Sequence, residues 1–324
     1  MANTIKAAII GCGGIGRTHA DCIRQIEGIE AVAYCDIYEE AARKLYNEFG
    51  GKYYTTDADR IFADDGIDAV YICTHHDTHA PFAIKAARAG KHILVEKPLA
   101  LTIEECEKVG EAVEKSGVKM MTAFKMRYYA MVQKAKELIP KPVLIVGQMT
   151  DNFWKEEHWA NDPVEGGGNV LSQGCHMVDI ICYMAGGRPV RVFAEGDCYY
   201  HPARKVIDNV VATISFDNGC VASWIQGDAN LPTYASKFFM ETFVKDKHCT
   251  LTDRFTRLMY AEGGKAQEFK GVETGFLEEN RGFVECIRNN TKPPIDHIDG
   301  LRATLIVLKA FEAIKTRRPQ EITV

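Results

Sequence analysis

The segment Glu96-Lys97-Pro98 carries the residue whose type and position most clearly suggest chemistry. It follows an apolar run at residues 92–95. A glycine-rich loop near the start of the chain precedes it by about the length of one mononucleotide-binding half of a dinucleotide-binding fold. A chargeable amine at the end of such a strand faces the ligand crevice and not solvent. The sequence therefore predicts that Lys97 lies in a redox active site. A sharp turn that aims Lys97 inward also predicts a cis peptide before Pro98, since only X-Pro bonds adopt that geometry at low cost.

The glycine-rich loop fits the pattern G-x-G-x-x-G, directly after a predicted strand and directly before a predicted helix. The first glycine allows a tight turn, the second lets the backbone approach a pyrophosphate, and the third allows close packing of strand and helix. Its residues are Gly11, Cys12, Gly13, Gly14, Ile15 and Gly16. The loop predicts a dinucleotide site at the helix N-terminus.

Asp36 ends the second predicted strand, 20 residues after Gly16, where a carboxylate accepts hydrogen bonds from the ribose hydroxyls. Ile37 and Tyr38 follow it, with no adjacent Arg or Ser to receive a 2′-phosphate. NAD is therefore the expected cofactor and NADP the less favoured one. Arg43 or Lys44 would be the residues to contact a 2′-phosphate if NADP were used.

Three histidines lie in the run Thr74-His75-His76-Asp77-Thr78-His79, after the strand predicted at residues 68–73. The loop belongs to the carboxyl edge of the sheet, so we expect it to shape the nicotinamide pocket. No cysteine or carboxylate completes a zinc ligand set at usual spacing, and no metal site is expected. His79 is the member expected to hold the loop in position.

A second candidate segment runs from three glycines at 166–168 to His176 and Asp179 on a predicted helix. These two residues share a helical face with Ser172, one turn earlier. A histidine among core residues is, taken alone, more often structural. A catalytic role for His176 therefore depends on the other motifs of the chain.

The composition restricts the class of partner. The formal net charge is -5 and no block of like charge occurs, which argues against nucleic acid or an anionic membrane. The 11 cysteines are scattered without a C-x-x-C pair, as expected of reduced, mostly buried thiols. We expect no signal peptide and no membrane-spanning segment, and the expected compartment is the cytoplasm.

The pattern of apolar residues predicts an α/β protein with two domains. Residues 1–123 alternate short apolar strands with helices, which is typical of a doubly wound parallel sheet, the Rossmann domain that would bind NAD. Residues 124–324 are expected to form an α/β domain for substrate binding and oligomerisation. Runs at 206–216, 220–226 and 237–244 alternate as half-buried strands do, with a hairpin turn at 217–219, and predict a large, open, mainly antiparallel sheet. Helices at 277–289 and 300–317 are expected to close the chain.

Together these motifs resemble the Gfo/Idh/MocA oxidoreductase family over essentially the whole chain. The carriers are the glycine loop, residues 89–98, 124–127 and 159–163, and the stretch from the three glycines to Asp179. The resemblance implies NAD or NADP as cofactor and sugars, cyclic polyols or their derivatives as substrates. It implies homodimers or homotetramers through the open sheet, with Lys97 as the catalytic lysine and His176 as the catalytic histidine.

The expected site residues follow from these motifs and the resemblance. The expected cofactor-binding residues are Gly11, Gly13, Gly14, Ile15, Gly16, Asp36, Thr74, His76, His79, Glu96, Lys97 and Arg127. The expected substrate-binding residues are Lys97, Asn152, Trp159, Ser172, His176 and Tyr234. Arg127 and Trp159 rest on the family pattern, whereas Asn152 and Tyr234 do not.

The chain departs from the family pattern at three places. The family usually has Asp where this chain has Ser172, Asn where it has Lys125, and Thr-Pro-Asn where it has Thr74-His75-His76. Ser172 can hydrogen-bond a sugar hydroxyl but cannot neutralise Lys97. Lys125 would suit an anionic substituent on the sugar, although a solvated lysine is the favoured explanation.

The function that the sequence favours is NAD-dependent oxidation of a secondary hydroxyl of a sugar, cyclic polyol or glycoside. His176 would take the hydroxyl proton while Lys97 polarises the oxygen, or a neutral Lys97 would be the base; the sequence leaves both open. A redox-neutral NAD-dependent glycosidase or lyase of the same family is the alternative. A non-catalytic NAD-binding regulator is disfavoured because Lys97 and His176 are both present.

Overall fold

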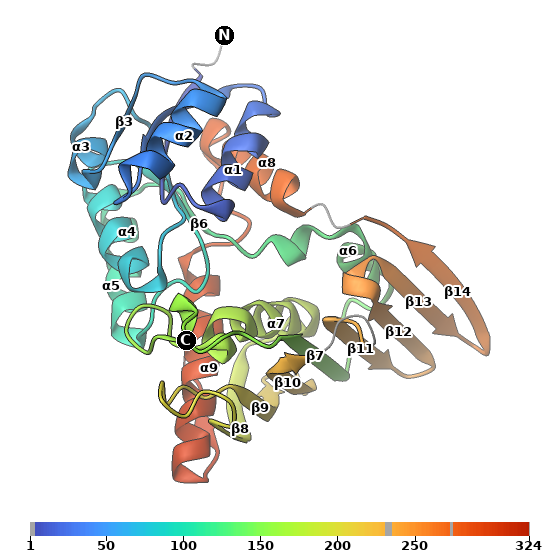
Figure 1. Ribbon diagram of the computed structural model, residues 1–324. Helices are drawn as coiled ribbons and strands as arrows, with labels where there is room; N and C mark the ends of the chain where they lie inside the picture. The colour runs from blue at the N-terminus through green and yellow to red at the C-terminus, as the bar shows by residue number, and fades with distance from the viewer. Residues whose placement is uncertain (1–3, 231–234, 273–274, 324) are drawn as a thin grey trace. The chain divides into compact units, whose positions relative to one another are not determined.

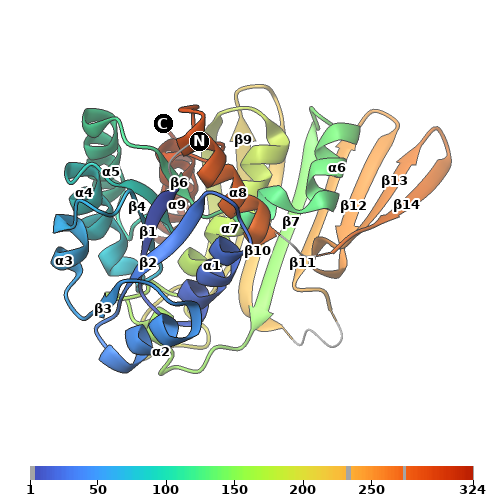
Figure 2. The same ribbon diagram turned by 90° about the horizontal axis from the view of Figure 1, so that it is seen from above.

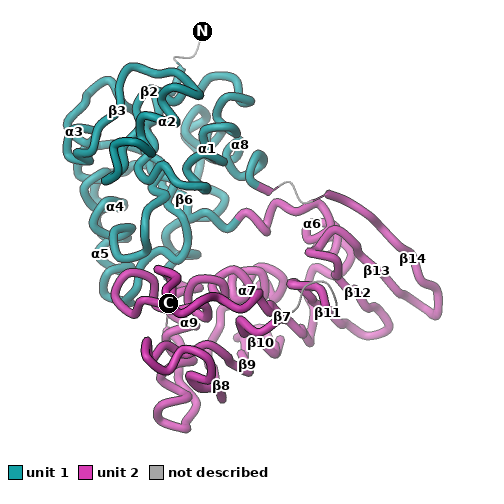
Figure 3. The backbone as a smooth tube through the Cα atoms, in the orientation of Figure 1, with its two compact units in different colours: residues 1–124, 276–301 teal, residues 125–275, 302–324 magenta. Residues whose placement is uncertain are grey.

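The computed structural model describes residues 4–230, 235–272 and 275–323. The chain divides into two compact units, shown in teal and magenta in Figure 3. Unit 1 comprises residues 1–124 and 276–301, and unit 2 comprises residues 125–275 and 302–324.

Unit 1 is built on a parallel sheet of six strands in the order β3-β2-β1-β4-β5-β6. This is the strand order of a dinucleotide-binding fold, with its switch point between β1 and β4. The strands are β1 (Ile5–Ile10), β2 (Ile29–Cys35), β3 (Tyr53–Thr55), β4 (Ala69–Ile72), β5 (His92–Val95) and β6 (Met120–Thr122). The central strands are almost wholly apolar and buried, because helices cover both faces of the sheet. The expected doubly wound parallel sheet is confirmed.

The helices of unit 1 lie on both sides of this sheet (Figures 1 and 2). They are α1 (Gly14–Arg24), α2 (Glu39–Phe49), α3 (Ala58–Ala63), α4 (His79–Arg88), α5 (Ile103–Ser116) and α8 (Gly275–Arg288), whose first residue belongs to unit 2. Local signals set their ends. For example, α5 begins with a capping box between Thr102 and Glu105 and ends at Gly117, which has a positive φ of 72°.

The segment 276–301 packs within unit 1, whereas the sequence pattern predicts one continuous second domain at residues 124–324. The ring of Phe283 on α8 lies edge-on to Tyr71 of β4, with centroids 5.6 Å apart. Asn280, one turn earlier on α8, hydrogen-bonds to His19 of α1. The parallel sheet buries the apolar face of α8, so the chain returns to unit 1 after β14.

Unit 2 contains a sheet of nine strands in the order β14-β13-β12-β11-β7-β10-β9-β8-β15. The strands are β7 (Leu144–Asn152), β8 (Pro189–Asp197), β9 (Asn209–Phe216), β10 (Val221–Asn230), β11 (Phe238–Val244), β12 (Lys247–Thr252), β13 (Arg257–Glu262), β14 (Lys265–Lys270) and β15 (Gln320–Glu321). Only the β7–β10 pair among these is parallel, so the sheet is mainly antiparallel as predicted. Along β9, buried residues alternate with more exposed ones, which shows that this strand buries one face.

The helix α7 (Asn169–Ala185) packs against β7 and β10, while α6 (Ala130–Leu138) packs against β12 and β13. Two glycines allow the close approach of α7. A Cβ atom on Gly147 would lie 2.8 Å from Ile181, and one on Gly174 would lie 2.5 Å from the ring of Trp224. The last long helix, α9 (His297–Thr316), begins in unit 1 and ends in unit 2.

Nine of the eleven cysteines are buried. Burial raises the pKa of the thiols of Cys22 and Cys286 to about 11, so these groups stay protonated at neutral pH. No helix in the described part of the chain has both the length and the hydrophobicity needed to cross a bilayer.

Candidate active site and family

The glycine loop follows β1 and ends in the first turn of α1. Gly11 has a φ of +93°, and a Cβ atom there would lie 2.5 Å from the backbone of Cys73. A Cβ atom on Gly16 would lie 2.0 Å from the carbonyl oxygen of Gly11. These two glycines are therefore required by the turn and by the packing of helix on strand.

Gly13 and Gly14 differ from those two glycines, because a Cβ atom on either would meet no atom within 4 Å. The space above the loop is open, and the first amides of α1, which have no acceptor within the helix, line it. Ile15 beside them is 43% exposed. A pyrophosphate fits this arrangement, because backbone N–H groups and the positive end of a helix dipole face the open space.

The carboxylate of Asp36 lies beside the same loop, just after β2. Its Oδ2 accepts a hydrogen bond from the backbone N–H of Cys12 at 2.8 Å, and its Oδ1 accepts one from that of Tyr38 at 2.9 Å. The two amides fix the carboxylate, and each oxygen keeps a lone pair for a ribose hydroxyl. Arg43 pairs with Glu40 at 2.8 Å, so this guanidinium has an acidic partner of its own. The residues of unit 1 thus fit NAD.

Lys97 lies at the carboxyl end of β5, and the Lys97-Pro98 peptide is cis, as predicted. Buried side chains hydrogen-bond to the backbone at Lys97 and at Pro98. The Glu96 carboxylate accepts a hydrogen bond from the Lys97 backbone N–H at 3.2 Å, and the Pro98 carbonyl lies 2.7 Å from Nδ1 of His79. The backbone that carries the Lys97 amine is therefore fixed on both sides.

The histidine loop places its three rings differently. His75 is exposed, His76 is 4% exposed, and His79 is fully buried at the start of α4. The second ring nitrogen of His79 faces the Thr74 carbonyl at 3.2 Å. Burial lowers the pKa of His79, so its ring is neutral at pH 7 and donates only once, to Pro98 at the shorter distance. His79 holds the backbone of this loop, whereas direct contact of Thr74, His76 and His79 with a cofactor stays a prediction.

Helix α7 carries the candidate residues of unit 2. Ser172 is 3% and His176 is 7% exposed, and they lie one turn apart on this buried helix. Asp179, one turn further on, is 1% exposed and forms an ion pair with Arg127. Arg127 comes from a short 3₁₀ helix, η2 (Lys125–Tyr128). The structure gives Arg127 this partner within unit 2, and its contact with the cofactor stays a prediction.

The loop between β7 and α7 carries Trp159, which is half-buried in a short 3₁₀ helix, η3 (Trp159–Asn161). Asn152, at the end of β7, is exposed. Tyr234 lies outside the described residues. The roles of these three residues stay predictions.

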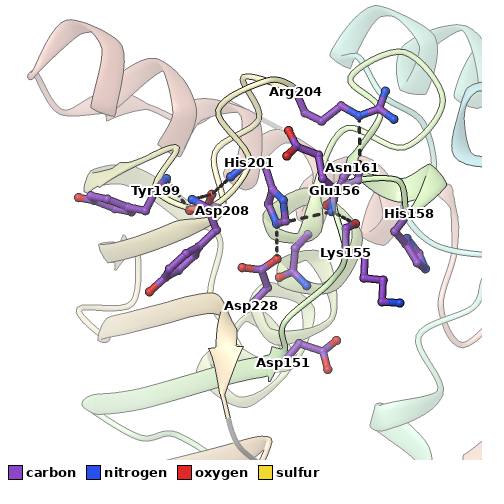
Figure 4. Close-up of polar contacts among 12 residues, drawn as sticks. Asp151, Lys155, Glu156, His158, Asn161, Tyr199, His201, Arg204, Asp208 and Asp228 are labelled. Atoms are coloured by element: carbon purple, nitrogen blue, oxygen red, sulfur yellow. Dashed lines mark hydrogen bonds and ion pairs between the residues drawn. The ribbon is translucent and has the colours of Figure 1, made fainter.

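A buried polar network supports this loop (Figure 4). Nε2 of His201 lies 2.7 Å from Oδ2 of Asp228 on β10, and both side chains are fully buried. Burial raises the pKa of Asp228. The amide nitrogen of Asn161 in the loop lies 3.5 Å from the same histidine nitrogen. His201 thereby connects the loop to the sheet.

The segment that carries His201 is itself fixed by charge (Figure 4). The buried carboxylate of Asp208 accepts hydrogen bonds from the backbone N–H groups of Tyr199, Tyr200 and His201. Arg204 binds Asp162 at 2.8 Å and the Glu156 carbonyl at 3.2 Å, and both partners lie in the loop after β7. The loop bearing Trp159 is therefore attached to a rigid support.

No sequence motif predicts a role for His19, Asn280, His201 or Asp228. Each lies in a segment without a motif of its own, and their partners are distant in the sequence. A polar residue within an apolar helix face was the available signal for His19, which follows the glycine loop on α1.

Two family profiles match consecutive parts of the chain. A family profile described as "Oxidoreductase family, NAD-binding Rossmann fold" matches residues 5–124, and one described as "GFO/IDH/MocA C-terminal domain" matches residues 132–238. The chain belongs to the Gfo/Idh/MocA oxidoreductase family. Residues 5–124 thus form an NAD-binding Rossmann domain, and this member of the family is an oxidoreductase.

Relatives of this Gfo/Idh/MocA protein span its whole length. A scyllo-inositol 2-dehydrogenase (NAD(+)) of Bacillus subtilis is 26% identical over 340 residues, covering 100% of this chain and 98% of the relative. A D-xylose 1-dehydrogenase (NADP(+)) of Haloferax volcanii is 32% identical over 332 residues, covering 97% and 98%. The fold is also that of a levoglucosan dehydrogenase solved with NADH and levoglucosan, with a TM-score of 0.89, 21% identity, and 98% and 99% of the two chains covered.

Proposed function

We propose that this protein oxidises a secondary ring hydroxyl of a sugar or cyclic polyol to a ketone, reversibly, with NAD as hydride acceptor. The observation that carries the proposal is the placement of Lys97 at the carboxyl end of β5, on a backbone held at Glu96 and Pro98. The named activities of the relatives, which act on scyllo-inositol and D-xylose, support a polyhydroxylated substrate.

His176 is proposed as the base. Removal of hydride from a carbinol carbon requires the hydroxyl proton to leave, so a base within hydrogen-bond reach of that oxygen lowers the barrier. An imidazole is largely neutral at pH 7 because its unperturbed pKa is about 6.5. The buried helix α7 restricts the rotation of the His176 side chain, which favours one fixed orientation of the base.

Lys97 is proposed to polarise the same oxygen. Its ammonium group would stabilise the negative charge that develops on the oxygen as the proton leaves. Ser172, one turn before His176, would hydrogen-bond a neighbouring ring hydroxyl, and Trp159 would stack on the apolar face of the ring. Asn152 and Tyr234 are proposed as further polar contacts.

The experiment measures NADH formation with a panel of inositols, aldoses and glycosides, and follows substrate consumption in parallel. His176→Asn is expected to lower kcat by about 10²- to 10⁴-fold, the usual contribution of a positioned acid-base group, with NAD binding retained. Lys97→Met is expected to lower kcat at least as much. His92→Asn, at the amino end of β5, is the histidine control and is expected to keep full activity.

Three outcomes would contradict this proposal in different ways. Full activity of His176→Asn at neutral pH would make Lys97 the base. Full activity of Lys97→Met would remove the proposed mechanism. Substrate consumption without net NADH would indicate the redox-neutral glycosidase or lyase reaction instead.

A further inference from the structure

His19 is a fully buried polar residue to which the motifs assign no role. It lies on α1, three residues after the last glycine of the loop, and none of its side chain is exposed. Its ring packs against Tyr71 of β4 at 5.4 Å and edge-on against Phe276 of α8 at 5.6 Å. A buried imidazole is costly unless its nitrogens are hydrogen-bonded, so its partners are informative.

Asn280 determines which nitrogen of His19 carries the proton. The amide nitrogen of Asn280 donates to the Phe276 carbonyl at 2.8 Å, which fixes the orientation of this amide. The same nitrogen lies 3.0 Å from Nδ1 of His19, nearer than the amide oxygen at 3.3 Å. An amide nitrogen only donates, so Nδ1 accepts, and we assign the ring proton to Nε2.

Nε2 of His19 lies 3.2 Å from Oε1 of Glu96, so the imidazole donates to this carboxylate. Oε2 of the same carboxylate accepts the hydrogen bond from the backbone N–H of Lys97. A continuous chain of hydrogen bonds therefore runs from Asn280 through His19 and Glu96 to the Lys97 backbone. Its first member, Asn280, lies 183 residues further along the sequence than Lys97.

We infer that His19 is a positioning residue for Lys97, acting through Glu96. The inference rests on the proposed function of Lys97. The carboxylate of Glu96 is nearly buried, so loss of the His19 donor would remove one of the hydrogen bonds that hold it and allow it to move. Movement of Glu96 releases the Lys97 backbone, and a displacement of about 1 Å at a reacting group is enough to cost roughly 10²-fold in rate.

The test compares His19→Gln with His19→Asn. The amide nitrogen of Gln reaches the place of Nε2 and can still donate to Glu96, whereas that of Asn reaches only the place of Nδ1. His19→Gln is expected to keep kcat within about 3-fold, and His19→Asn to lower it about 10- to 100-fold, the loss of one hydrogen bond to a charged group. His92→Gln, on the other end of β5, is the control and is expected to keep the parent kcat.

Glu96→Gln in both backgrounds tests the route. If His19 acts through Glu96, the His19→Asn substitution should cost little more once Glu96→Gln is present. Equal losses in His19→Gln and His19→Asn, or fully additive losses with Glu96→Gln, would overturn the inference, because both would indicate ordinary core packing.

A measurement on the parent protein separates this inference from the proposed function. ¹⁵N NMR of the histidine rings, without substrate, is expected to show His19 as the Nε2–H tautomer. The Nδ1–H tautomer would overturn the inference whatever the reaction is, and it also decides the matter if the variants fail to fold. Full activity of Lys97→Met would instead remove the proposed function and leave the tautomer unchanged.

Discussion

Arg127 and Asp179 form a two-point ion pair in which two guanidinium nitrogens bind the two oxygens of one carboxylate. Nε of Arg127 lies 2.9 Å from Oδ2 of Asp179, and Nη2 binds Oδ1. The Asp179 side chain is 1% exposed and that of Arg127 is 12% exposed. The pair attaches η2 to the turn of α7 that follows His176, so it holds the helix that carries the proposed base.

Asp179→Asn should destabilise the protein strongly. The substitution removes the charge of Asp179 from beside the nearly buried guanidinium, and breaking a buried pair from one side costs about 3–5 kcal/mol. Urea unfolding measures the loss. Glu104→Gln, which breaks the exposed Glu104–Lys108 pair, is the control and should leave the unfolding midpoint unchanged. A similar small effect of both substitutions would mean that the Arg127 pair adds no stability.

Asp36→Ser should weaken NAD binding more than NADP binding. The carboxylate accepts hydrogen bonds from the ribose and repels a 2′-phosphate, and the substitution removes both effects. Because Cys12 and Tyr38 donate to this carboxylate, some loosening of the glycine loop is also expected. Calorimetric titration with each cofactor measures the change. Equal affinity of the parent protein for both cofactors would contradict the assignment of Asp36.

Ser172→Asp tests the departure from the family pattern. If the position only orients its neighbours, the carboxylate should leave dehydrogenase activity intact or improved. If Ser172 makes room for a bulky or anionic sugar, affinity for that substrate should fall while simple polyols gain. Both residues are tolerated near a helix start, so the fold should persist. No change with any substrate would show that Ser172 does not contact substrate.

His79 should make the folded state sensitive to acid. Burial lowers the pKa of His79. Between the lowered pKa and the unfolded pKa, the ring is therefore neutral in the folded protein and protonated in the unfolded chain. The stability it contributes is present above the unfolded pKa of about 6.5 and is lost as pH falls from there through the lowered pKa of the folded state. His79→Asn keeps a donor near Pro98 but cannot titrate, so its unfolding free energy should fall less steeply with decreasing pH.

His92→Asn is the comparison variant, because burial also lowers the pKa of His92. Each substitution should remove its own part of the pH dependence, and the double variant should remove both. An unchanged pH profile in His79→Asn would show that the buried ring does not control acid stability.

The second sheet is expected to bind another copy of the chain. Leu144 of β7 and Val221 of β10 are paired neighbours on its accessible face, 40% and 47% exposed, and Val211 of β9 is 58% exposed. We propose that this apolar surface forms a homodimer or homotetramer interface. Val211→Lys should shift the sedimentation coefficient toward the monomer, whereas Val272→Lys, at an exposed residue after β14, should not. A monomeric parent protein would contradict the proposal.

The sequence alone determined the parts of this protein that depend on local chemistry. The glycine loop and Asp36 are recognisable because each role needs one residue type at one spacing along a single strand-turn-helix unit. The regular alternation of apolar strands and helices likewise predicted the parallel sheet, since periodicity reflects which side of an element is buried. The cis peptide at Pro98 was predictable because only proline permits it readily. The polar and exposed β14 and the three-residue β3 gave no such pattern and were missed.

Only the tertiary structure decided which distant segments meet. Val221 lies beside Leu144 in a parallel pair, and α8 returns from the far end of the chain to unit 1. The tertiary structure also decides the contact between Asn280 and His19, which are 261 residues apart in the sequence. No local pattern distinguishes such partners, because an apolar helix face or a buried polar side chain can be satisfied by any complementary surface. Which surface becomes the partner depends on how all segments of the chain pack together in the folded protein.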